Sequence, residues 1–160
     1  MKTVTDKIRQ GLISQLGQTV TSSPSAFMLW LAPVVREIDH GAMTFEYVVR
    51  KEMTNPIGTL HGGVTAAIMD DMIGATIISL GREHFYTTVN NVIDYFSTAK
   101  CGDLITGKTK VIKAGQQIIN VQFELWNLGK ERLLARGYSN ALKTDHKIID
   151  PETANHNPNK

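Results

Sequence analysis

A pair of glycines and a carboxylate eight residues later have the residue types and the spacing of a candidate catalytic site. Gly62-Gly63 follows His61 and opens a long apolar segment that contains Asp70. Glycines at a helix start let a ligand approach the backbone and leave unpaired N–H groups, which the helix dipole makes partly positive. Such donors can stabilise an oxyanion. Tight packing of a loop against a sheet explains the glycine pair equally well.

Asp70 is the stronger signal because a charged group is costly to bury. It lies in the middle of the predicted helix, directly after Met69 and two places before Met72. A structural carboxylate satisfied by hydrogen bonds, or a strip of helix that meets solvent, remains an alternative, and Asp71 could be the exposed member of the pair. The pattern favours a functional carboxylate at Asp70.

Gly62 and Asp70 are too far apart to act together from one chain. On one straight helix they lie about 12 Å apart along the axis and are turned by roughly 80°. A base or nucleophile must act within about 3–3.5 Å of the reacting carbon. Either the two residues have unrelated roles, or two subunits each supply half of a site. The second possibility predicts an obligate dimer with two symmetry-related sites.

Hydrophobic periodicity predicts the elements that position these residues. Residues 8–16 have the spacing of an amphipathic helix that ends near Gly17, and residues 25–31 form a short helix or turn between two prolines. Alternation over 43–49 predicts a strand. The segment 64–80 is apolar on every side, which predicts a buried helix. Four strand-like runs follow, separated by turn residues: 86–96, 104–113, 118–127 and 132–142.

Long strands on short turns predict an antiparallel meander. The order of elements predicts an α+β fold in which one antiparallel sheet wraps around one long buried helix. We expect a helical segment over 1–32, the sheet-and-helix domain over 33–143, and a polar tail over 144–160.

Composition excludes several classes of function. A net charge of +2 suits an anionic small ligand and does not indicate nucleic acid. No apolar run reaches the ~18 residues of a membrane span. The single cysteine, Cys101, excludes an internal disulfide and favours a cytoplasmic location. The five histidines show no metal-ligand spacing, and no Gly-x-Ser-x-Gly motif is present, so we expect neither a metal nor another cofactor.

The run Asn55-Pro56-Ile57-Gly58-Thr59-Leu60-His61-Gly62-Gly63, with Asp70 nine places after His61, resembles the hotdog-fold thioesterases. The nearest branch is similar to the phenylacetate-pathway thioesterases, relatives of the 4-hydroxybenzoyl-CoA thioesterases. The resemblance covers about residues 37–143. It implies hydrolysis of an acyl-CoA or aroyl-CoA to free acid and CoA, without a cofactor, by a homodimer that can pair into a dimer of dimers.

The resemblance also implies roles for the motif residues. Asp70 would be the general base or the nucleophile, and the N–H of Gly62 from the partner subunit would polarise the thioester carbonyl. Asn55 would lie beside the thioester, and His61 would orient the loop around Asn55. Gly63 would contact the substrate.

The resemblance also extends to residues that follow the motif. Thr88 falls where relatives carry a Ser or Thr that positions water, although a threonine also suits a strand. The turn from Ser97 to Lys100 is similar to the family's strand end near the CoA entrance, so the resemblance implies that Ser97 and Lys100 bind the substrate or CoA. Lys100 could meet a CoA phosphate or be an ordinary surface lysine. Many relatives have proline where this chain has Thr98, so the shape of this turn can differ.

Two other functions fit the same fold. A hotdog hydratase or dehydratase would act on an acyl-CoA, but such enzymes use an Asp/His or Glu/His pair in a different local pattern. A non-catalytic acyl-CoA-binding module is the second alternative, and no fused regulatory domain supports it.

Overall fold

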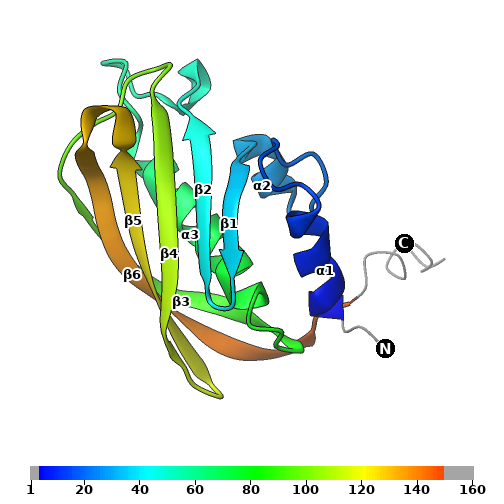
Figure 1. Cartoon of the computed structure of the whole chain (residues 1–160). Helices are drawn as coiled ribbons and strands as arrows, with labels where there is room; N and C mark the ends of the chain where they lie inside the picture. The colour runs from blue at the N-terminus through cyan, green and yellow to red at the C-terminus, as the bar shows by residue number, and fades with distance from the viewer. Residues whose placement is uncertain (1–3, 150–160) are drawn as a thin grey trace, which may run out of the picture.

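The computed structural model describes residues 4–149 of the chain (Figure 1). In that range one antiparallel sheet contains six strands: β1 (Val34–Asp39), β2 (Ala42–Val48), β3 (His84–Tyr95), β4 (Leu104–Ala114), β5 (Ile118–Asn127) and β6 (Arg132–Lys147). Helix α3 (Gly62–Ile78) packs against the sheet. The predicted α+β class, with an antiparallel sheet around one long helix, is confirmed.

The strand order departs from a simple meander. The strands lie in the order β1-β2-β4-β5-β6-β3, so the predicted meander holds for β4, β5 and β6. A meander would place β3 beside β4, but β3 pairs with β6 instead. The physical reason is that β2 and β5 already occupy both sides of β4. The chain therefore returns from β3 to β4 through residues 96–103.

Alternation along the strands fixes the face that receives α3. Met43, Phe45 and Tyr47 of β2 are buried, and the residues between them are partly exposed. A side chain at Gly107 of β4 would collide with Sδ of Met72 on α3. This glycine therefore lets the helix lie close to the sheet.

Helix α3 is buried on most sides but not on all. Ile68, Met69 and Met72 are buried, whereas Asp70 and Gly74 are exposed. Residues four apart share one face of a helix, so Asp70 and Gly74 lie on the same open strip. The predicted buried helix is thus correct except along the strip that carries the carboxylate.

Two short helices precede the sheet, α1 (Val4–Ile13) and α2 (Ala26–Leu31). Both lie beyond β1 in Figure 1, and Ser25 caps α2. At the other end of the chain, β6 continues to Lys147 and so takes up the first residues of the range 144–160 predicted as a tail. The part of that range from residue 150 onward lies outside the described residues.

The two edges of the sheet differ. At the start of β1 the N–H of Gly17 donates to the carbonyl of Val35, and Thr19 pairs with Val34, so residues 17–20 cover the first residues of that edge. Within residues 4–149 nothing pairs with the outer side of β3. This edge is 12 residues long and exposes apolar side chains such as Val89. Such an edge is a template for pairing with another chain.

Candidate active site

The carboxylate of Asp70 is held by two side chains of the neighbouring strand. Thr88 Oγ1 donates a hydrogen bond of 2.8 Å to Asp70 Oδ1, and Asn91 Nδ2 donates one of 3.0 Å to the same oxygen. No donor among residues 4–149 reaches the other oxygen, Oδ2. The carboxylate is therefore oriented through one oxygen and accessible through the other.

A β-bulge brings both donors to the same side of β3. The pairing with β6 skips Val89, which is thus an extra residue in the strand. In a regular strand, residues three apart point to opposite faces of the sheet. The bulge interrupts that alternation, so Thr88 and Asn91 can both reach Asp70.

Helix α3 begins with a side-chain cap. His61 is the N-cap residue, and its Nδ1 accepts a hydrogen bond of 2.9 Å from the N–H of Gly63. A Cβ on Gly63 would lie only 3.0 Å from that Nδ1, so a larger residue there would push against the capping side chain. The cap uses the Gly63 N–H and leaves the N–H of Gly62 available.

Gly62 combines an open approach with a free donor. A Cβ on Gly62 would make only ordinary contacts, the nearest at 3.6 Å to the ring of Tyr95. Tyr95 also donates a hydrogen bond of 3.1 Å to the Gly62 carbonyl. In the described part of the chain the Gly62 N–H donates to no acceptor. This N–H lies at the positive end of the helix dipole.

Asn55 organises the turn that precedes His61. Its Oδ1 accepts hydrogen bonds from two backbone N–H groups of the turn, including that of Thr59 at 3.1 Å, and its Nδ2 donates to Thr59 Oγ1 at 2.8 Å. The His61 side chain bonds to Gly63. Asn55 and His61 thus shape two consecutive pieces of backbone that lead into Gly62.

The segment after β3 lies beside this turn. Lys100 forms an isolated bridge with Thr59, and its side chain is exposed. Ser97 is half-buried, and its Oγ donates to the carbonyl of Leu133 at 2.7 Å. The structure therefore places Lys100 near the helix start and ties Ser97 to β6.

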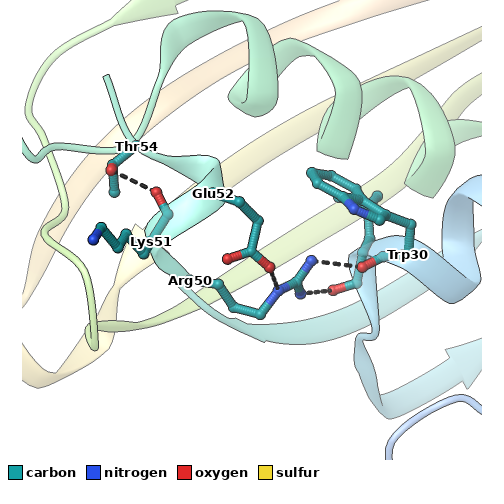
Figure 2. Close-up of polar contacts among 6 residues, drawn as sticks. Trp30, Arg50, Lys51, Glu52 and Thr54 are labelled. Carbon is teal, nitrogen blue, oxygen red and sulfur yellow. Dashed lines mark hydrogen bonds and ion pairs between the residues drawn. The ribbon is translucent and has the colours of Figure 1, made fainter. Parts of the chain in front are cut away.

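Arg50 connects the end of β2 with the end of α2 (Figure 2). Its Nη1 and Nη2 donate to the carbonyls of Leu31 and Trp30 at 3.0 and 2.6 Å, and its Nε bonds to Glu52 at 2.6 Å. The last carbonyls of a helix have no partners within the helix, so the guanidinium caps α2. The 3₁₀-helix η1 (Lys51–Met53) follows and leads into the Asn55 turn.

Asp71, rather than Asp70, is the desolvated carboxylate of α3. Its Oδ1 accepts a hydrogen bond of 3.1 Å from Ser25 Oγ. Its Oδ2 and the Tyr47 hydroxyl are buried and have no partner among residues 4–149. Burial raises the pKa of Asp71 to about 6; the Ser25 hydrogen bond opposes this shift, and the charge of Asp70 adds to it. The expectation that Asp70 is the buried carboxylate is corrected: it faces the open strip.

A cavity of about 630 Å³ opens beside Asp70. Its walls come from α1, the segment before α2, the second half of α3 and the start of β3. This volume falls within the range of roughly 300–1,000 Å³ typical of small-molecule sites. In residues 4–149 no group of three or more His, Cys, Asp or Glu side chains could hold a metal ion.

The predicted site residues fall into two groups at different points of α3. Thr88 contacts Asp70 on the open strip. The turn of Asn55, the cap of His61 and the Lys100 bridge surround the helix start. The side-chain hydrogen bond of Ser97 goes to the Leu133 carbonyl, which belongs to neither group.

Sequence reasoning missed Asn91, although it bonds to the same carboxylate as Thr88. Strand alternation places it on the opposite face from Thr88, and no residue type marks the bulge. Tyr95 was also missed, because an aromatic residue in a strand is ordinary.

The sequence and the fold are similar to those of known thioesterases. Residues 57–133 match the profile of the thioesterase superfamily. Human acyl-coenzyme A thioesterase 13 is 34% identical over 97 residues, which cover 61% of this chain and 69% of the human protein. The structure of zebrafish thioesterase superfamily member 2 aligns with a TM-score of 0.72 and 25% identity, over 87% of this chain and 97% of that one.

The PaaI protein of E. coli, from its phenylacetic acid degradation operon, shares the fold with a TM-score of 0.75 and 16% identity, over 91% of this chain and 97% of that one. An antiparallel sheet around a central helix that carries the carboxylate defines a hotdog-fold enzyme. The chain belongs to the thioesterase superfamily. It is an acyl-CoA thioesterase, a hydrolase of thioesters. No helix in the described range is long and apolar enough to cross a membrane.

Proposed function

We propose that the chain hydrolyses an acyl-CoA or aroyl-CoA to the free acid and CoA, with Asp70 as general base or nucleophile. The arrangement of the Asp70 carboxylate carries this proposal. Thr88 and Asn91 hold Oδ1, and Oδ2 is free of donors within residues 4–149, beside a cavity of small-molecule size. A base or nucleophile needs a fixed direction and an accessible lone pair, and this carboxylate has both.

Both chemical routes use the free oxygen. As a base, Oδ2 takes a proton from a water molecule that attacks the thioester carbon, and the C–S bond then breaks to release the acid and the CoA thiolate. As a nucleophile, Oδ2 attacks that carbon, the CoA thiolate leaves, and water hydrolyses the resulting anhydride. Negative charge develops on the carbonyl oxygen in either route, and a backbone N–H aimed at that oxygen lowers the barrier. The free N–H of Gly62 is suited to this task.

The Gly62 that serves a given Asp70 belongs to a second copy of the chain. Both residues lie on α3, eight residues or about 12 Å apart. The open edge of β3 supports pairing with the same strand of another copy, which is a self-complementary contact. Thr88 and Asn91 lie on that strand, so the site adjoins the proposed interface. Pairing of dimers into a dimer of dimers is compatible with this arrangement.

The remaining motif residues would build the second half-site. Asn55 and His61 position the backbone of Gly62 and Gly63, and Asn55 would lie beside the thioester. Lys100, exposed next to the Asn55 turn, would meet a CoA phosphate. Ser97 would support the strand end that leads to this turn. A free, exposed Cys101 is consistent with the cytoplasmic location that we propose.

The test replaces Asp70 by Asn and follows thiol release from acyl-CoA. We expect turnover to fall by about 10²–10⁴-fold because the base or nucleophile is lost. Asp39→Asn is the matched control, since Asp39 is an exposed carboxylate at the end of β1. Turnover near the wild-type value in Asp70→Asn would overturn the mechanism. Incubation of the wild-type protein with crotonyl-CoA checks the rival reaction, because a hydratase would add water without releasing thiol.

A further inference from the structure

The cavity beside Asp70 is walled by the N-terminal helices as well as by α3. Asp70 and Ile78 both line it, so it follows α3 for about 12 Å. Its apolar lining includes Ile8, Leu12, Met28, Ile77, Ile78 and Phe85. The carboxylate of Asp70 thus stands at one end of a largely apolar space.

Two glycines face this space although nothing in the chain's packing requires them. Gly74 lies one helical turn after Asp70 in α3, and Gly11 lies inside α1. Both line the cavity, and a Cβ on either would have no atom within 4 Å. Glycine inside a helix is less stable than alanine. The effect of these glycines is to leave room in the cavity, in the case of Gly74 directly beside the reacting carboxylate.

The wall formed by the N-terminal segment is fastened in place. Ser25, at the start of α2, bonds to Asp71 of α3, and Arg50 holds the carbonyls at the end of α2 (Figure 2). The side chain of Gln15 accepts the N–H of Thr21 at 2.8 Å and donates to the carbonyl of Ser22 at 3.0 Å. The cavity is therefore built into the fold before any ligand arrives, as is usual for small-molecule sites.

We propose that this cavity receives the acyl group of the thioester, and that Gly74 and Gly11 set the length of acyl group it accepts. The substrate class is then an apolar acyl group extending well beyond acetyl. This inference rests on the proposed function, because it takes Asp70 as the residue at the thioester carbon. The acyl group passes Gly74 and runs along α3 toward Ile78.

The lining favours the acyl group over the pantetheine arm of CoA. That arm carries two amides, and an amide buried without a hydrogen bond is costly. A methylene chain or an aromatic ring instead gains free energy from each apolar contact.

The test fills the cavity and compares substrates of different length. Gly74→Leu and Gly11→Leu are assayed by thiol release from acetyl-, hexanoyl- and decanoyl-CoA. Gln10→Leu is the matched control, because Gln10 is exposed on the same helix as Gly11 and does not line the cavity. We expect the ratio of kcat/KM for decanoyl-CoA to kcat/KM for acetyl-CoA to fall about tenfold or more in both Leu variants. Gly74→Ala should show a smaller loss while melting at a higher temperature.

A binding measurement separates this inference from the catalytic proposal. In Asp70→Asn protein, calorimetry with non-cleavable acyl-CoA thioethers should show affinity rising by up to about fourfold per added methylene. Gly74→Leu should abolish that rise and leave the affinity for free CoA unchanged.

Three results would overturn the inference: an unchanged decanoyl-to-acetyl ratio in the Leu variants, equal losses on all three substrates, or weaker binding of free CoA. Failure of the catalytic proposal is distinct, since it appears as full activity in Asp70→Asn.

Discussion

Thr88 and Asn91 lie three residues apart on β3, yet both donate a hydrogen bond to the same oxygen of Asp70. The extra residue Val89 between them makes this geometry possible. The direction of the carboxylate therefore depends on an irregularity in the strand as much as on the helix that carries it. A change in β3 can therefore alter the direction of the Asp70 carboxylate while α3 stays the same.

Removing either donor should impair the chemical step more than binding. Thr88→Val and Asn91→Ala each remove one hydrogen bond to a charged group, and we expect kcat to fall about tenfold or more with little change in KM. Thr88→Ser keeps the hydroxyl and should restore most of the activity. Thr87→Val is the control on the adjacent exposed residue. Wild-type kcat in both of the donor-removing variants would show that the hydrogen bonds are dispensable.

Shared sites predict complementation between two inactive chains. Gly62→Pro removes the free N–H at a helix position where proline is tolerated, and should lower turnover by about 10²–10³-fold. Gly62→Ala keeps the N–H and serves as the control. A mixed dimer of Gly62→Pro with Asp70→Ala contains one intact site and should recover about half of the wild-type activity. Confirmed mixed dimers with no recovered activity would place both groups in one chain.

A charge on the open edge of β3 should separate the two copies. Val89→Lys places an ammonium on an edge proposed to pair with another chain, a device that natural sheets use against such pairing. Ile112→Lys is a close control, since Ile112 is also a bulge residue and is 53% exposed against 61% for Val89. Light scattering should report monomers for the first variant only, with activity lost in parallel. A Val89→Lys protein that remains dimeric would exclude this edge as the interface.

The buried carboxyl of Asp71 predicts a pH dependence of stability. Its pKa of about 6 in the folded chain exceeds the ordinary 3.8, so the folded state binds more protons between these values. The free energy of unfolding should therefore fall as the pH rises from about 4 to 6. Asp71→Asn removes this loss and should raise stability at neutral pH by on the order of 2–3 kcal/mol. Urea unfolding at about pH 4.5 and pH 7 compares the two proteins, and equal pH slopes would contradict the expectation.

The pattern of apolar residues predicted the helices and strands well because buried positions recur every second residue in a strand and about every 3.6 residues in a helix. Met43, Phe45 and Tyr47 alternate as a half-buried strand must, and the helix predicted over 64–80 is observed over Gly62–Ile78. The place of β3 could not be predicted in the same way. Alternation shows which side chains face the core, but it does not say which strand lies alongside.

The site was predictable only in part. The spacing of Gly62 and Asp70 follows from helix geometry, and both do lie on one helix. Asp70 and Asp71 have similar apolar neighbours in sequence, so which of them meets solvent depends on where Ser25 and β3 pack. The contact of Asn91 with Asp70 could not be predicted, because no residue type in the sequence marks the position of the bulge.

The covered edge of β1 has a consequence for assembly. Residues 17–20 occupy the start of that edge, so in residues 4–149 the sheet offers a long free edge at β3 alone. A sheet with two free edges can add copies without limit and grow into a fibre. A sheet with one free edge reaches its final size when two copies have joined. If β3 pairs with a second copy as proposed, the segment between α1 and α2 therefore keeps the start of the other edge from accepting a further copy.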